Sequence, residues 1–136
     1  MRFEAEGMGS AALVVDKSRG KGGTGVGFKP TELLLHALAA CLATTVVQVL
    51  ANQRLAVRGH QLQLHGERAA AVPARFTRIM VGRHFTGDQL KPDNLERIVA
   101  LADDNYCSVS AMLPRGLVEH QVHVHAGITP EGGNSP

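Results

Sequence analysis

The chain has 136 residues, of which 44% are hydrophobic, and a formal net charge of +2. This length and composition predict one globular domain over residues 1–136 that can bury a core of its own. The basic residues are scattered, no Trp is present and there is one Tyr, so the sequence argues against nucleic-acid binding by base stacking.

The N-terminal segment and the cysteine content together indicate the compartment. The first residues, MRFEAEGMG, include acidic side chains and no apolar run, so they do not resemble a secretory signal peptide. The chain has two cysteines, Cys41 and Cys107. Two cysteines without a signal peptide predict a cytoplasmic protein whose thiols are available for chemistry, rather than a secreted scaffold held by disulfides.

The chain begins with two short runs, residues 1–6 and 11–16, which predict a β-hairpin. The sequence Gly-Met-Gly-Ser at residues 7–10 would form its turn. A stretch with five glycines follows at residues 17–28 and predicts a loop. It lacks the Gly-Lys-[Ser/Thr] ending of a phosphate-binding loop, so a flap packed near the next helix is preferred over a phosphate site.

Residues 29–53, KPTELLLHALAACLATTVVQVLANQ, predict a long helix around which the rest of the chain is arranged. Pro30 suits the first turn of a helix, Thr31 is a candidate cap, and Glu32 would meet the positive end of the helix dipole. From Leu33 onward the helix has no formal charge and carries apolar residues on every face. This pattern predicts a helix that is buried all round.

The alternative for such an apolar run is a single membrane span, since about 20 apolar residues cross a bilayer. Polar residues interrupt the run at His36, Thr44, Thr45 and Gln48, and the sequence contains no second run of this kind. A central helix wrapped by a sheet is therefore the preferred interpretation, and no association with a membrane is expected.

After the long helix, alternating residues predict strands at residues 55–67 and 75–85, with a bulge at Gly59. A second helix is predicted at residues 92–104. Its buried stripe would be made of five apolar side chains: Leu95, Ile98, Val99, Leu101 and Ala102.

One helical turn is expected after Cys107, followed by a last strand at residues 117–125 and a polar, frayed tail. The valines of this strand would face inward, and His123 and His125 outward. Because the strands and helices are grouped rather than strictly alternating, the predicted class is α+β with a mostly antiparallel sheet.

Few residues offer metal or cofactor chemistry. The two cysteines are far apart in the sequence and lack the paired spacing of zinc ligands, so no metal site and no cofactor are expected. His123 and His125 could hold a metal only with a further ligand, and exposed histidines are the preferred interpretation. His36 is interpreted as a core or interface histidine.

Cys41 by itself allows two interpretations, a small buried hydrophobe or a reactive thiol. It lies beyond the positive end of its own helix, whose field decays within a turn. A reactive thiolate at this position would therefore need a cation from elsewhere in the chain, and Arg19 and Arg2 are the candidates.

Two motifs resemble those of a known family. The phrase GFKPTELLL at residues 27–35, followed by ALAAC at residues 37–41, and the later YCSVS at residues 106–110 are similar to the paired signatures of the OsmC/Ohr family, the osmotically inducible and organic-hydroperoxide-resistance proteins. The triple leucine is most similar to the less characterised OsmC-like branch. The resemblance implies an intertwined homodimer, in which two long central helices pack together inside the wrapped sheets.

The resemblance also implies a thiol peroxidase that reduces organic hydroperoxides. Cys41 would be the peroxidatic cysteine and Cys107 the resolving cysteine, and an external dithiol would be the reductant. Arg19, or Arg2, would hold the thiolate, and Glu32 would orient the arginine. The alternative function is a non-catalytic dimer that binds a small hydrophobic ligand between its helices, both cysteines being merely buried.

Overall fold

The computed structural model describes residues 2–6 and 12–125, so the turn predicted at residues 7–10 and the predicted polar tail lie outside the described residues. The chain divides into two compact units, residues 1–37 and residues 38–136. The boundary falls within the long helix α1 (Pro30–Asn52). The prediction of a single domain stays a prediction.

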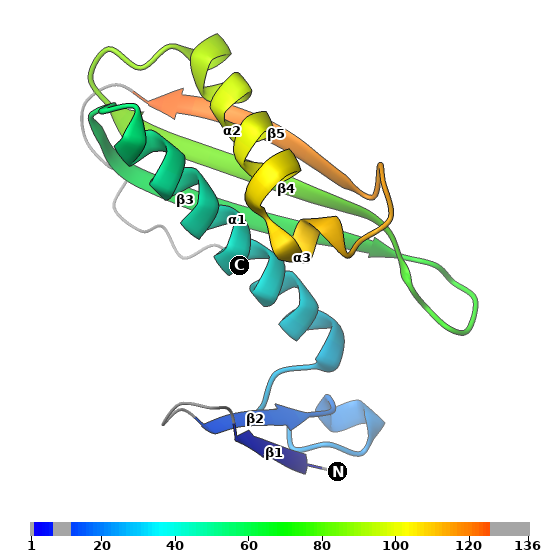
Figure 1. The fold of residues 1–136 in the computed structure, drawn as a ribbon. Coiled ribbons are helices and arrows are strands. Elements are labelled where there is room, and N and C mark those ends of the chain that lie inside the picture. The colour runs from blue at the N-terminus through cyan, green and yellow to red at the C-terminus, as the bar shows by residue number, and fades with distance from the viewer. Residues whose placement is uncertain (1, 7–11, 126–136) are drawn as a thin grey trace. The chain divides into compact units, whose positions relative to one another are not determined.

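In the first unit, β1 (Arg2–Glu6) pairs antiparallel with β2 (Ala12–Asp16), as the hairpin prediction expects (Figure 1). The glycine-rich segment that follows is a loop containing one short 3-10 turn, η1 (Arg19–Lys21). The backbone of Phe28 makes two hydrogen bonds to the last residues of β2. Its N–H donates to Val14 O, and its carbonyl accepts from Asp16 N, each at 3.0 Å.

The carboxylate of Asp16 holds the glycine-rich loop together. It accepts the backbone N–H groups of Lys17 at 2.7 Å, Thr24 at 2.8 Å and Gly25 at 3.1 Å. It also accepts the hydroxyl of Thr24, and this bond is the main reason that the pKa of Asp16 is lowered to about 2. The predicted flap is thus fastened to the end of β2 by one acidic side chain.

Helix α1 begins at Pro30, and Glu32 caps its start. The carboxylate of Glu32 accepts the backbone N–H of Lys29 at 3.0 Å and lies 3.5 Å from the Lys29 ammonium. This is the backward half of a capping box, and the hydrogen bond from Lys29 lowers the pKa of Glu32. Thr31, the predicted cap, lies inside the first turn instead.

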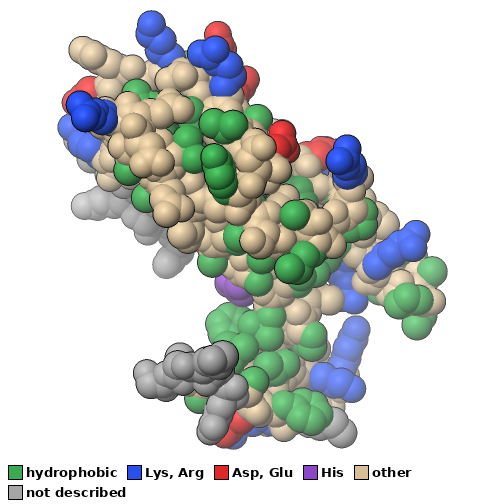
Figure 2. All heavy atoms as spheres, viewed as in Figure 1, with side chains coloured by type: hydrophobic (Ala, Val, Ile, Leu, Met, Phe, Trp, Pro, Cys, Tyr) green, Lys and Arg blue, Asp and Glu red, His purple; other side chains and the backbone are tan. Residues whose placement is uncertain are grey.

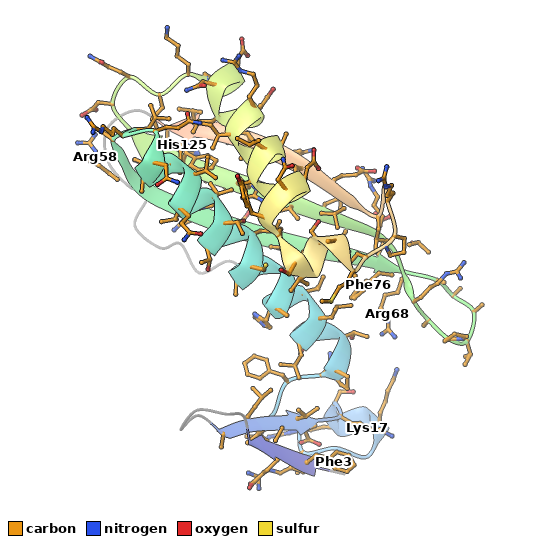
Figure 3. The ribbon with its side chains drawn as sticks, viewed as in Figure 1. Phe3, Lys17, Arg58, Arg68, Phe76 and His125 are labelled. Carbon is orange, nitrogen blue, oxygen red and sulfur yellow. The ribbon has the colours of Figure 1, made fainter. Side chains whose placement is uncertain are left out.

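The second unit contains a three-stranded sheet in the order β3 (Val57–Arg68), β4 (Phe76–Gly87) and β5 (Val118–His125). Strands β3 and β4 are antiparallel, and a register shift between Val57 and Gly59 confirms the predicted bulge. Arg68 pairs with Phe76 where the two strands meet their connecting turn, and Arg58 and His125 mark the opposite end of the sheet (Figure 3).

Strand β5 runs parallel to β4, so the sheet is mixed and not antiparallel throughout. A parallel pair needs a long crossover, which is supplied here by α2 (Pro92–Tyr106) and α3 (Ser108–Ala111). The predicted α+β class is confirmed, with two antiparallel strand pairs and this one parallel pair among the described residues.

The core of the second unit lies between the sheet and the helices, because α2 and the second half of α1 cover the same face of the sheet (Figure 1). One cluster of this core contains eight buried residues: Val46, Val49, Leu50, Phe85, Leu95, Ile98, Val99 and Ala102. The stripe predicted for α2 is therefore correct except at Leu101, which is 44% exposed.

Within one chain, α1 is buried on one side and not all round. Leu38, Leu42 and Val46 are fully buried, whereas Val47 is 54% exposed. Hydrophobic side chains reach the surface over α1 and α2 (Figure 2). Among the described residues, α1 is the one helix whose length and composition alone would let it cross a membrane. Its inner side packs into a protein core, as expected for a core helix.

Candidate active site

Cys41 and Cys107 lie together in the second unit. Cys41 is partly buried in the middle of α1, and Cys107 is 2% exposed at the residue that ends α2 and precedes α3. Both are free thiols, and the S–H of Cys107 donates a hydrogen bond to the sulfur of Cys41. The structure thus brings together the two cysteines that the sequence motifs single out.

Backbone N–H groups favour the thiolate of Cys41. The N–H of Val109 is the largest influence and lowers the pKa of Cys41, and the S–H of Cys107 and the N–H of Ser108 act in the same direction against burial. These N–H groups belong to the first turn of α3, where they have no partner within the helix. The pKa of Cys41 is therefore lowered by backbone donors, which have no residue signature in the sequence.

Cys107 has the opposite character. Its pKa is raised to about 11, chiefly by burial and also by the hydrogen bond that it donates to Cys41. Since the thiolate is the nucleophilic form of cysteine, the two sulfurs are already differentiated in the reduced protein. Cys41 is the accessible sulfur that favours the thiolate, and Cys107 is the enclosed thiol.

A cluster of titratable side chains, Arg83–Asp103–His120, adjoins the cysteine pair; Arg83 and Asp103 are buried, whereas the side chain of His120 is 25% exposed. Arg83 is fully buried, and its Nη2 donates to Asp103 at 2.9 Å to Oδ1 and 2.7 Å to Oδ2. His120 Nε2 lies 3.2 Å from Asp103 Oδ2. Burial raises the pKa of Asp103 to about 6 against the pull of Arg83, and burial together with Arg83 lowers the pKa of His120 to about 4. At neutral pH the cluster therefore consists of one cation, one anion and a neutral imidazole.

The sequence analysis missed this cluster, although its members stand at core-facing positions. Arg83 lies between the buried residues Val81 and Phe85 in the alternation of β4. Asp103 lies four residues after Val99 on the buried stripe of α2. A charged side chain in phase with buried apolar neighbours was the available signal.

The other predicted site residues belong to the first unit and have local partners there. Arg19 Nε donates to Thr24 O at 2.9 Å, and Arg2 Nη2 lies 2.9 Å from Glu4. Glu32 is engaged at the start of α1. Their roles beside Cys41 stay predictions, because that residue belongs to the second unit.

Three histidines gather on the outer face of the sheet, where the sequence indicated two. His84 of β4 stacks against His123 and His125 with ring centroids 4.8 and 5.3 Å apart, and His84 Nδ1 lies 3.0 Å from His125 Nε2. Among the described residues, no three His, Cys, Asp or Glu side chains are arranged to hold a metal ion. The contacts among the three rings are stacking contacts and one hydrogen bond between His84 and His125.

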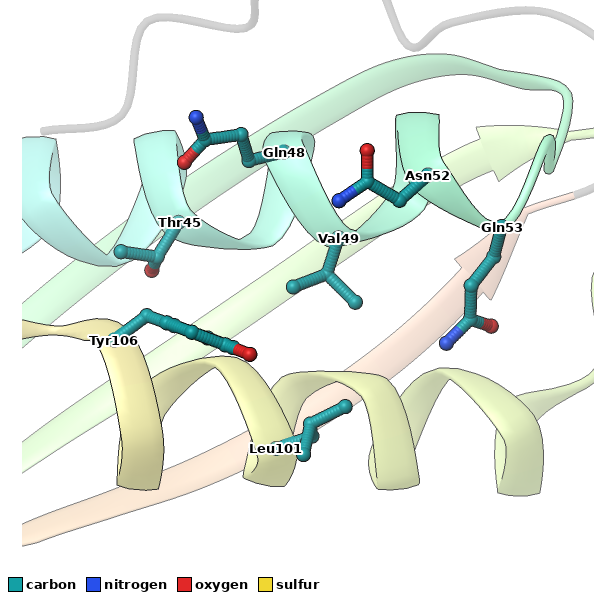
Figure 4. A pocket seen from close by; sticks show the side chains of 7 residues that line it. All are labelled: Thr45, Gln48, Val49, Asn52, Gln53, Leu101 and Tyr106. Carbon is teal, nitrogen blue, oxygen red and sulfur yellow. The ribbon is translucent and has the colours of Figure 1, made fainter.

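An open groove of about 320 Å³ runs between α1 and α2 on the surface of the second unit (Figure 4). Seven residues line it: Thr45, Gln48, Val49, Asn52, Gln53, Leu101 and Tyr106. The groove lies next to both cysteines. Thr45 is one helical turn after Cys41, and its hydroxyl donates to Cys41 O at 3.0 Å. Tyr106 directly precedes Cys107.

Comparison with known proteins places this arrangement in a family. The family profile described as OsmC-like protein matches residues 20–123. Protein YhfA of Escherichia coli strain K12 is 35% identical over 98 residues, which cover 71% of this chain and 73% of that protein.

Solved structures share the fold. A hypothetical protein from Aquifex aeolicus VF5 superposes with a TM-score of 0.76 at 21% identity, covering 94% of this chain and 97% of that chain. An organic hydroperoxide resistance protein OsmC from Legionella pneumophila superposes with a TM-score of 0.63 at 22% identity, covering 91% of this chain and 94% of that chain. By the profile match over most of its length and its identity to YhfA, the chain belongs to the OsmC-like protein family.

Proposed function

We propose that the chain is a thiol-dependent peroxidase that reduces organic hydroperoxides, with Cys41 as the peroxidatic cysteine and Cys107 as the resolving cysteine. The observation that carries the proposal is the hydrogen-bonded pair of sulfurs, in which the pKa of Cys41 is lowered, chiefly by the Val109 N–H, and burial raises that of Cys107 to about 11. The fold shared with an organic hydroperoxide resistance protein supports the choice of substrate.

The reaction would proceed in three balanced steps. The Cys41 thiolate attacks the terminal peroxide oxygen, the O–O bond breaks, and the alkoxide takes a proton to leave as an alcohol while Cys41 becomes a sulfenic acid. The sulfur of Cys107 then attacks that of Cys41, and the S–O bond breaks to release water and form a disulfide. An external dithiol reduces this disulfide by exchange and is itself oxidised.

The proposal includes a homodimer built on α1. The outward side of this helix exposes apolar side chains such as Val47, and an apolar surface of this kind on a helix calls for cover. A second copy of the chain would supply that cover. Arg19, or Arg2, is proposed to hold the Cys41 thiolate, and Glu32 to orient the arginine. The protein is proposed to work in the cytoplasm without nucleic acid or membrane.

The groove between α1 and α2 favours the alternative of a non-catalytic dimer that binds a small hydrophobic ligand. Val49, Leu101 and the ring of Tyr106 give the groove apolar walls. In that case the cysteines would be structural, and their different environments would serve no reaction.

Steady-state turnover with a dithiol reductant tests the proposal. Organic hydroperoxides should be reduced at least about tenfold faster in kcat/KM than hydrogen peroxide, the effect of about 1.4 kcal/mol from one or two buried methylene groups. Cys41→Ser should abolish turnover, and Cys107→Ser should allow one round and then accumulate over-oxidised Cys41. An inactive wild-type protein with an unreactive Cys41 would favour the ligand-binding dimer.

A further inference from the structure

Arg83 is buried with unused hydrogen-bonding capacity. Its Nη2 bonds to both oxygens of Asp103, but its Nε and Nη1 have no hydrogen-bond partner among the described residues. Buried polar groups are nearly always paired, and leaving a charged one unpaired is costly. Two free donors on one fully buried guanidinium therefore suggest an acceptor that forms only transiently.

The acceptor indicated by the surroundings is the sulfur of Cys107, because Arg83 holds Asp103, which lies one helical turn before Cys107 at the end of α2, and both of these residues are buried. Burial lowers the pKa of Arg83, while Asp103 and a negative charge at Cys107 raise it. A cation held beside this sulfur would favour its thiolate once the charge of Cys41 is gone. In the reduced protein this thiolate is disfavoured, because burial, and after it the hydrogen bond that Cys107 donates to Cys41, raise the pKa of Cys107 to about 11.

The titratable groups that act around the two side chains come from helices α1 and α2 and from all three strands of the second unit, and Asp104 of α2 acts on Asp103 and His120. Cys107 is influenced by Cys41 from α1 and by Asp103 from α2. Arg83 in turn acts on His60 from β3 and His120 from β5. Burial, and then Arg83, lowers the pKa of each of these histidines to about 4, so both are neutral at neutral pH. Arg83 is accordingly the cation that can act on Cys107.

We propose that Arg83 is a positioning residue for the resolving step, and that its guanidinium stabilises the thiolate which Cys107 forms to attack oxidised Cys41; this rests on the proposed peroxidase function. When Cys41 becomes a sulfenic acid, its negative charge disappears and it no longer holds the proton of Cys107. Cys107 then releases that proton, its sulfur bonds to Cys41, and the departing hydroxide takes up the proton as water. Asp103 keeps the guanidinium in place.

Titration of Cys107 in a Cys41→Ser background tests the electrostatic part without any peroxide. This substitution removes the charge of Cys41, so the ultraviolet absorbance of the Cys107 thiolate can be followed against pH. Arg83→Met should raise the midpoint by at least one pH unit, about a tenfold loss of thiolate. Arg83→Lys should restore most of the shift. Arg78→Met is the matched control on the same strand, since Arg78 is exposed and paired with Glu119 at 2.7 Å.

A single turnover in the wild-type cysteine background tests the resolving step. Arg83→Met should slow disulfide formation by about tenfold, the effect of one pH unit, while the rate of sulfenic acid formation at Cys41 stays within about threefold. If Arg83→Met does not fold by circular dichroism, Arg83→Gln, which keeps a donor for Asp103, replaces it in both experiments.

An unshifted Cys107 titration and an unchanged rate of disulfide formation in a folded Arg83 variant would overturn the role of Arg83. Failure of the wild-type protein to form any sulfenic acid would instead overturn the peroxidase function. In that event the titration still decides whether Arg83 acts on Cys107.

Discussion

Cys41 and Cys107 touch through one hydrogen bond and yet are predicted to react at very different rates. A thiol-alkylating reagent at neutral pH should modify Cys41 first, because the N–H groups of Val109 and Ser108 favour its thiolate and its sulfur is less enclosed. The rate of modification should follow a titration whose midpoint lies below that of an ordinary cysteine. Mass spectrometry of the peptides measures both rates, and earlier labelling of Cys107 would contradict the assignment.

Asp16 carries a pH dependence of its own. Its folded pKa of about 2, lowered chiefly by the Thr24 hydroxyl, lies below the unfolded value of about 3.9. The resulting stabilisation is fully present above pH about 4 and is lost as the pH falls through about 2. Hydrogen exchange of the loop amides should show loosening over that range, and Asp16→Asn should loosen them already at neutral pH.

Asp88→Asn is the control for this experiment. Asp88 is an exposed acid whose carboxylate lies 2.7 Å from Arg58, and it belongs to the second unit. Its substitution should leave the exchange of the loop amides unchanged. A similar loosening in both variants would mean that the loop is not held by Asp16.

At the scale of single elements, the buried face of α2 can be tested with two substitutions. Ile98→Ala should lower the free energy of unfolding by about 2–5 kcal/mol, because Ile98 is packed in the core. Leu101→Ala, three residues away, should cost much less, since Leu101 is 44% exposed. Urea denaturation measures both, and equal losses would show that Leu101 is covered in solution.

The sequence predicted the elements well because their patterns are local. Alternation located the strands, and the charge-free run located α1. The parallel pairing of β5 with β4 could not be predicted in the same way, because strand direction depends on the end of the sheet to which the chain returns after α2. The stabilisation of Cys41 was also beyond sequence analysis, since it comes from the backbone of α3. Arg83 and Asp103, in contrast, were visible in the periodicity and were overlooked.

At the scale of the whole molecule, the exposed side of α1 predicts a homodimer. Val47→Glu places a charge on that side and should shift the protein toward a monomer in analytical ultracentrifugation, because an unpaired charge cannot be buried cheaply in an apolar interface. Val72→Glu is the control, since Val72 is 96% exposed in the turn between β3 and β4. A wild-type protein that is monomeric at micromolar concentration would contradict the prediction.

Cys107 caps the C-terminal end of α2 and directly precedes α3, so its oxidation in the proposed cycle would affect the stability of the fold. A disulfide to Cys41 would fasten the middle of α1 to that junction and close a loop containing β3, β4 and α2. Closing a loop of roughly 65 residues restricts the unfolded chain by about 4 kcal/mol in the chain-entropy account. The oxidised protein should therefore melt at a higher temperature than the reduced one. The dithiol that completes the cycle would have to work against that gain, so the fold itself would help to select a strongly reducing partner.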